Sequence, residues 1–141
     1  MTIQAVLLPL FVQVALTFVL LFWMGTVRVA AIRRGEVHPR DIALRQPSWP
    51  QSVAQVGNAY HNQFELPVLF YVLVILAWMT RQADFLFVLL AWVFVVLRVL
   101  HAYVHVTTNR LPHRFYLFLA GAIVLVVMWV IFALGLLLRA G

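Results

Sequence analysis

Residues 53–80 read VAQVGNAYHNQFELPVLFYVLVILAWMT, and this stretch decides the fold. Its second half, from Leu66 to Met79, is almost wholly apolar, whereas its first half carries polar side chains at helical spacing. A helix needs about 20 predominantly apolar residues to cross the hydrocarbon core of a bilayer. The stretch therefore predicts a transmembrane helix with polar groups on one face of its first half.

Three other segments have the length and apolar character of membrane spans, at about residues 3–27, 85–107 and 115–138. Only 10% of the residues are charged, whereas a soluble domain carries about a quarter. Backbone groups in lipid must be hydrogen-bonded within the chain, which favours helices. We therefore predict an all-α membrane protein in which residues 1–141 form one domain, a four-transmembrane-helix bundle.

Two local features refine the second predicted helix. Pro67 has no backbone N–H, so it frees a carbonyl near position 63, and we expect a kink there. Ser48 or Ser52 is the expected N-cap, because a serine hydroxyl can bond to the first free N–H groups. Short connections on either side of the third helix predict antiparallel neighbours.

The charged residues predict how the chain lies in the membrane. The net charge of +6 comes from arginine alone, and cytoplasmic loops of membrane proteins are enriched in such residues. The two loops that we expect in the cytoplasm, residues 28–52 and the connection between the third and fourth helices, carry seven arginines: Arg28, Arg33, Arg34, Arg40, Arg45, Arg110 and Arg114. Both termini are then expected on the opposite side. The other side has Arg81 and Arg139. We therefore expect a multi-pass protein with the 28–52 loop in the cytoplasm.

Composition also excludes several classes of function. A chain without cysteine has no disulfide, thiol nucleophile or thiolate metal site. The basic charge is accounted for by topology and by contact with lipid headgroups, so we predict membrane lipids and no nucleic acid as partners. No basic residue precedes the first apolar run, which predicts a retained helix rather than a cleaved signal peptide.

Polar and ionisable side chains inside a span are energetically unfavourable and indicate function. On the second helix they recur at offsets of 0, 3, 4 and 7 residues, on one helical face: Asn58, His61, Asn62 and Glu65. On the third helix they are Arg98, His101 and His105. Counted from the cytoplasmic ends, Glu65 and Arg98 have the same depth, as have His61 and His101. We therefore expect the two stripes to face each other.

These residues allow several interpretations. Glu65 and Arg98 can form a structural ion pair that fixes the register of the helices. Asn58 and Asn62 can supply hydrogen bonds between helices. Imidazole together with carboxylate suits zinc or iron, so the chain also contains a candidate set of metal ligands: His61, Glu65, His101 and His105.

The stretch NQFELPVLF, from Asn62 to Phe70, resembles the second-helix motif of the MAPEG family, the membrane-associated proteins in eicosanoid and glutathione metabolism. That motif has an Asn, a Glu three residues later, a Pro two residues after that, and then a Phe. The third helix is similar in order and spacing to the bacterial branch, from Ala91-Trp92-Val-Phe94 through Arg98 and two histidines to Asn109-Arg110. The resemblance implies a homotrimer in a bacterial inner membrane that binds glutathione between protomers on the cytoplasmic side.

The resemblance also implies roles for individual side chains. Asn62 and Glu65 match the glutathione-binding Asn and Glu, and Glu65 would hold the amino group of the tripeptide. Arg110 or Arg114 would meet a glutathione carboxylate, and Arg28 would be the catalytic residue that stabilises the thiolate. The remaining residues expected at the glutathione site are Asn58, His61, His101 and His105.

The implied function is a transferase or peroxidase that uses glutathione, or another small thiol, against lipophilic electrophiles arriving through the bilayer. The chain departs from the transferases of the family in having Asn58 in place of Arg and Leu66 in place of Tyr. His101 and His105 replace two tyrosines of the leukotriene-type enzymes. Two alternatives therefore remain: a non-catalytic trimer that binds lipid or a partner protein, and a His/Glu metal-binding membrane protein.

Overall fold

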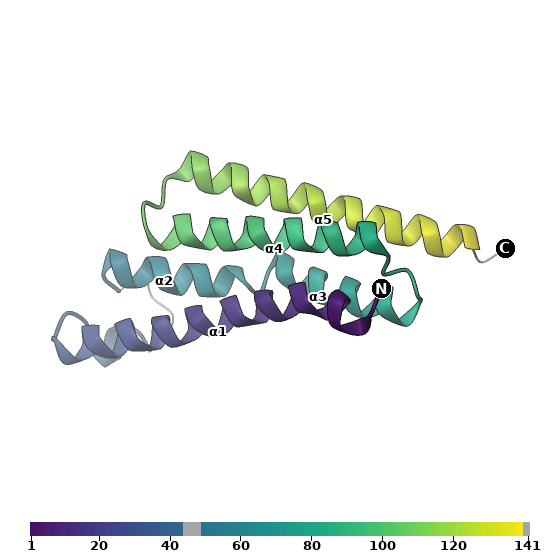
Figure 1. The fold of residues 1–141 in the computed structure, drawn as a ribbon. Helices are drawn as coiled ribbons and strands as arrows, with labels where there is room; N and C mark the ends of the chain where they lie inside the picture. The colour runs from purple at the N-terminus through teal and green to yellow at the C-terminus, as the bar shows by residue number, and fades with distance from the viewer. Residues whose placement is uncertain (44–48, 140–141) are drawn as a thin grey trace.

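A computed structural model describes residues 1–43 and 49–139 and shows a bundle of long helices (Figure 1). The described residues form helices and no strand: α1 (Ile3–Arg33), the 3-10 helix η1 (Pro39–Asp41), α2 (Gln51–Asn62), α3 (Leu66–Met79), α4 (Phe85–Val106) and α5 (Leu111–Arg139). Four segments are long and apolar enough to cross a membrane, with α2 and α3 together forming one of them. The predicted all-helical architecture with four spans is confirmed.

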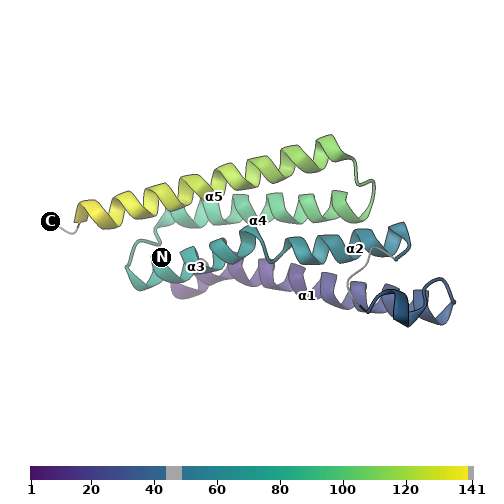
Figure 2. The same ribbon diagram turned by 180° about the vertical axis from the view of Figure 1, so that it is seen from behind.

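The helices run alternately up and down the bundle. Both termini lie at the same end as the α3–α4 turn, and the α1–α2 connection and the α4–α5 turn lie at the other end (Figure 1). We call this second end the loop end. Helix α4 contacts α1, α2 and α5, and both views show it between α5 and the α2–α3 segment (Figure 2). Its central place explains why the polar side chains of α4 are buried.

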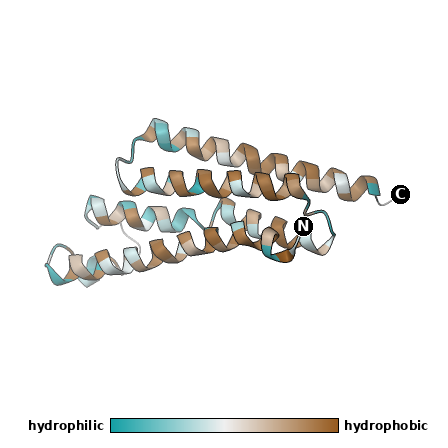
Figure 3. Ribbon diagram, viewed as in Figure 1, coloured by the Kyte–Doolittle hydropathy of each residue, from teal (hydrophilic) through white to brown (hydrophobic). Residues whose placement is uncertain are grey.

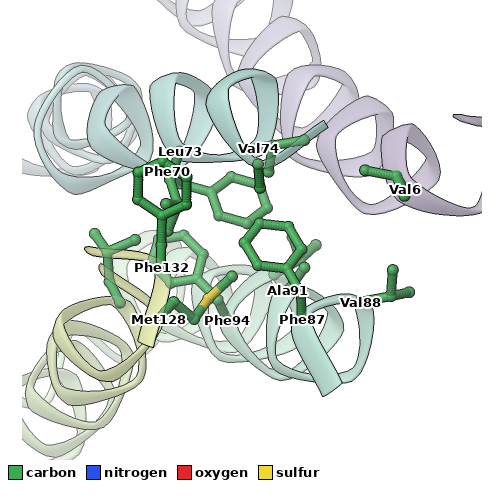
Figure 4. Close-up of a cluster of buried hydrophobic side chains, with 13 residues drawn as sticks. Val6, Phe70, Leu73, Val74, Phe87, Val88, Ala91, Phe94, Met128 and Phe132 are labelled. Atoms are coloured by element: carbon green, nitrogen blue, oxygen red, sulfur yellow. The ribbon is translucent and has the colours of Figure 1, made fainter. Parts of the chain in front are cut away.

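Apolar packing fills the half of the bundle that is nearer the termini. Phe70 of α3 stacks on Phe94 of α4 with ring centroids 4.8 Å apart, and Met128 and Phe132 of α5 close the same cluster (Figure 4). Hydrophilic residues instead gather on α2, toward the loop end (Figure 3). The bundle thus separates a packed apolar half from a half in which polar groups meet.

The ends of two helices differ from those expected. Helix α1 continues to Arg33 instead of ending near residue 27, because arginine is a good helix former and hydropathy marks only the end of the apolar stretch. Arg28 is therefore a helical residue. Helix α5 begins at Leu111 instead of near residue 115, since Pro112 is well tolerated in a first helical turn.

The prediction that Ser52 is the N-cap of the second span is also wrong. Pro50 occupies the N-cap position of α2, and Ser52 lies inside the first turn. The sequence Trp49-Pro50 favours an extended backbone at this point, so the helix starts earlier than the serine. Ser48 and Arg45 lie outside the described residues.

The second span is interrupted at residues 63–65, between α2 and α3. The expected kink near position 63 is present, but the helix stops there altogether. Turn-like bonds run from Gln63 N to Tyr60 O at 3.0 Å and from Glu65 N to Asn62 O at 3.3 Å. Pro67 falls in the first turn of α3, where its missing N–H is tolerated. Glu65, the last residue of the interruption, lies midway between the ends of the span, Gln51 and Met79.

Candidate functional site

A cleft of about 430 Å³ opens between α2, α4 and the start of α5, in the loop-end half of the bundle. We call it the polar cleft. It is lined by Asn58, His61, Asn62, Glu65, His101, His105, Leu111, Arg114, Phe115 and Phe118. The two polar stripes predicted on the second and third spans thus face one hollow. Of the residues expected at the glutathione site, all but Arg110 line this cleft.

Glu65 is the only acidic residue among those that line the cleft. It occupies the N-cap position of α3, yet its carboxylate makes no capping bond to the backbone, and the residue is exposed. The start of a helix carries partial positive charge, which favours a carboxylate there. The fold therefore places the Glu65 carboxylate, which does not cap the helix, near the middle of a membrane span.

Arg98 of α4 lies behind the cleft and is 1% exposed. Its Nη2 donates to the backbone oxygen of Asn62 at 3.4 Å and to the side-chain Oδ1 of the same residue. The expected direct ion pair with Glu65 is not formed in the described part of the chain, where Arg98 bonds to Asn62 instead. The interruption at 63–65 takes Glu65 out of the helical stripe, so Asn62 meets the guanidinium instead.

Several buried nitrogens around the cleft have no hydrogen-bond partner among the described residues: Nε and Nη1 of Arg98, Nδ1 of His101 and Nδ1 of His105. The two imidazole rings lie edge to face, with centroids 5.7 Å apart. Buried polar atoms in native proteins are nearly always hydrogen-bonded. The wall of the cleft and the layer behind it are therefore polar, which suits a polar or charged ligand better than an apolar one.

The alternative metal site does not form in the structure. Among residues 1–43 and 49–139, no group of three or more His, Asp or Glu side chains is close enough together to hold a metal ion. His61, Glu65, His101 and His105 all line the cleft, but they do not come together as such a group. Imidazole groups arranged in this way suit hydrogen bonding to an extended ligand better than metal coordination.

Arg114 is the arginine that reaches the cleft from the loop end. It lies in the first turn of α5, where its Nη1 donates to Oδ1 of Asn109 at 2.9 Å. Asn109 has a φ of 50°, a left-handed conformation that asparagine adopts more readily than most residues. Arg110 is exposed and does not line the cleft. Of the two arginines expected to meet a carboxylate, Arg114 is the better placed.

Arg28 lies on another face of the bundle. Its Cζ is 4.9 Å from the ring centroid of Trp49, and its Nη2 is 2.9 Å from the point where a Cβ on Gly57 would lie. The missing side chain at Gly57 therefore makes room for the guanidinium between α1 and α2. Arg28 does not line the polar cleft of its own chain, so its predicted catalytic role has no support from the cleft geometry.

Sequence reasoning missed a second polar contact beside the cleft. Gln13 of α1 donates from Nε2 to Oε1 of Gln63 at 2.8 Å, and both side chains are almost fully buried. A glutamine in the middle of an apolar span was a usable signal, by the same reasoning that identified Glu65. Asn109 was also missed as the residue that holds Arg114.

An apolar groove of about 600 Å³ runs between α3 and α5. We call it the α3–α5 groove. Its lining residues are Leu66, Leu69, Ala122, Leu125, Val126, Trp129, Val130 and Ala133. Leu66 directly follows Glu65, and Ala122 lies one helical turn after Phe118 of the cleft. The groove therefore begins beside the polar cleft and extends toward the apolar half of the bundle.

Comparison with known proteins agrees with these features. The family model of the MAPEG family matches residues 6–134. Neither the curated proteins nor the solved structures contain a match to the chain.

Proposed function

Since the chain belongs to the MAPEG family, we propose that it is a glutathione-dependent transferase or peroxidase acting on lipophilic electrophiles. Four spans and this family membership make it an integral membrane protein, and the family is generally associated with glutathione. The observation that carries the proposal is the pairing of a free carboxylate, Glu65, with an arginine, Arg114, in one cleft. Glutathione carries both an ammonium and two carboxylates, which such a cleft can bind.

In this proposal, different cleft residues bind the peptide and activate its thiol. Glu65 accepts hydrogen bonds from the ammonium group, an interaction that is strong away from bulk water. Arg114 supplies positive charge for a carboxylate and for the thiolate, and its bond to Asn109 keeps it oriented. His101 and His105 line the same cleft, and their imidazole rings supply hydrogen-bonding groups along the peptide. Binding and charge complementarity are sufficient for this chemistry, without a covalent enzyme intermediate.

The proposed reaction balances in either form. In a transferase, the thiol loses its proton, the sulfur bonds to the electrophilic carbon, and the acceptor releases a leaving group or takes up a proton. In a peroxidase, two glutathione molecules reduce one hydroperoxide to an alcohol and water and are oxidised to the disulfide. Both forms need a thiolate beside an apolar acceptor, and the cleft and the α3–α5 groove lie next to each other.

The groove gives a testable prediction about the acceptor. Ala122→Phe fills part of the α3–α5 groove, so we expect KM for a lipophilic electrophile to rise about tenfold, which corresponds to roughly 1.4 kcal/mol. KM for a small water-soluble electrophile should stay unchanged. Ile123→Phe is the matched control, because Ile123 is 55% exposed and does not line the groove. Equal effects on both electrophiles would show that the groove does not bind the acceptor.

We propose that the active unit is a homotrimer with the loop end in the cytoplasm, where soluble thiols occur. Asn58, His61 and Glu65 are exposed in the isolated chain, although they lie in a membrane span. A charged group facing lipid costs about 2.5–3.5 kcal/mol near the bilayer centre. A neighbouring protomer that covers the cleft would remove this contact with lipid.

The test of the proposed function is thermal unfolding of the detergent-purified protein with and without millimolar glutathione. A ligand at 100 times its Kd stabilises the native state by about 2.7 kcal/mol, so we expect a clear rise in Tm. Sodium chloride at the same ionic strength controls for nonspecific effects of salt. If glutathione has no effect but a different small thiol raises Tm, the class of reaction stands and the cosubstrate is wrong. No shift with any thiol would contradict the proposal.

A further inference from the structure

The Gln13–Gln63 pair joins α1 to the chain at the helix interruption, and neither residue lines the polar cleft. Gln13 is 0% exposed and Gln63 is 1% exposed, and their amide groups meet at 2.8 Å between α1 and the end of α2. Two apolar side chains would fill the same space between helices in a bilayer without needing partners. A hydrogen-bonded amide pair adds a fixed relative orientation, which apolar packing alone does not provide.

Gln63 also replaces a backbone bond that the interruption removes. Its own N–H turns to Tyr60 O, at 3.0 Å, instead of completing the helical bond to Ala59 O. The side-chain Nε2 of Gln63 donates to that Ala59 oxygen at 2.9 Å. An unsatisfied carbonyl within the membrane is strongly unfavourable, because no water is there to bond to it. The amide of Gln63 thus ends α2, while its oxygen is held by Gln13.

The residues on either side of Gln63 point to the cleft. Asn62 lines it and accepts from Arg98, and Glu65 lines it from the N-cap of α3. The interruption is otherwise held by short turn-like bonds, and Pro67 removes the donor for the carbonyl of Gln63. Few interactions therefore decide how the segment between Asn62 and Glu65 is arranged.

We propose that Gln13 and Gln63 are positioning residues, which hold the interruption in the geometry that presents Asn62 and Glu65 to the ligand. This inference rests on the proposed function for its consequence in binding. Gln13 acts from α1, a helix that contributes no residue to the lining of the cleft. The pair contributes little to global stability, because a single interhelical hydrogen bond in a membrane is weak.

The test uses Gln13→Leu, which leaves Gln63 able to bond to Ala59. We expect amide hydrogen exchange in residues 63–66 to become about three- to fifteenfold faster, the range set by one interhelical hydrogen bond. We expect the Kd for glutathione to rise by a similar factor, with only a small change in Tm. Gln4→Leu is the matched control: it makes the same change on the same helix, at an exposed position, and should alter neither quantity.

Amide hydrogen exchange and the Kd for glutathione together show which part of the proposal fails. Unchanged exchange in Gln13→Leu would show that the pair does not hold the interruption. Faster exchange with an unchanged Kd would show a purely structural contact and would overturn the positioning role. If the parent protein does not bind glutathione, the proposed function fails, and the exchange measurement still decides whether the pair controls the interruption. Gln63→Leu should give faster exchange than Gln13→Leu, because it also leaves Ala59 O without its donor.

Discussion

Glu65→Gln is expected to abolish measurable glutathione binding and leave the ligand-free protein as stable as the parent. Removing one partner of a desolvated charge pair costs about 2–5 kcal/mol, which is a loss of affinity of roughly 30-fold or more. The substitution keeps the shape of the side chain and removes its charge. Calorimetric titration with glutathione and the glutathione-dependent rise in Tm both measure the effect.

The stability of the ligand-free variant follows from the position of Glu65. Its carboxylate makes no capping bond, so the neutral amide loses no backbone contact. A charge in the middle of a span is unfavourable by about 2.5–3.5 kcal/mol, and the neutral amide avoids this cost. We therefore expect the Tm without ligand to stay the same or rise slightly.

Glu36→Gln provides the matched control for this prediction. Glu36 is an exposed residue in the connection after α1, and it does not line the cleft. The same loss of one carboxylate there should leave glutathione affinity unchanged. If Glu65→Gln binds glutathione as tightly as the parent, Glu65 does not hold the ammonium group. If both variants lose affinity equally, the effect is one of overall charge.

The spans could be predicted because length and apolarity are the only requirements for crossing a bilayer. The same signal does not say where a helix ends, and α1 runs on to Arg33 through residues that prefer the interface. Pro67 indicated an irregularity near position 63 but not its extent. That extent depends on tertiary contacts of Gln63 with Gln13, a residue fifty positions away, which no local pattern contains.

The sequence predicts those residues of the candidate site whose position depends only on helical spacing. Asn58, His61 and Asn62 lie on one face of α2, and the structure places all three at the cleft. The roles of the arginines were harder to predict from the sequence, because spacing gives the depth of a residue in the membrane but not the helix that it faces. Arg28 was expected at the site, yet it turns toward Gly57 and Trp49. Arg114 reaches the cleft because α5 starts at Leu111, earlier than hydropathy indicated.

Arg114→Gln is expected to lower kcat/KM for glutathione conjugation by about a hundredfold or more. Removing one preorganised donor from a developing anion typically costs a factor of 10²–10³ in rate. The bound thiolate would also lose the positive charge that stabilises it. The rate profile should therefore move to higher pH, because more alkaline solution is then needed to form the thiolate. Steady-state rates between neutral and alkaline pH measure both effects.

Two arginine substitutions of the same kind serve as controls for Arg114→Gln. Arg110→Gln changes an exposed residue only four positions away, and we expect rates within about twofold of the parent. Arg28→Gln removes the cation over Trp49, so it should affect stability more than rate. If Arg28→Gln lowers the rate and shifts the pH profile as strongly as Arg114→Gln, Arg28 acts on the thiolate, from a neighbouring protomer.

The position of Arg114 explains why we expect its substitution to lower the rate more than substitution of Arg110 or Arg28. It lies in the first turn of α5, where the helix already carries partial positive charge, and a cation at such a place is unfavourable by about 0.3–1 kcal/mol. The bond to Asn109 holds it there in spite of that repulsion. An anion bound in the cleft would interact with both the guanidinium and the start of the helix. The glutathione-dependent rise in Tm should therefore be smaller in Arg114→Gln than in Arg110→Gln, and equal rises would show that Arg114 does not contact the ligand.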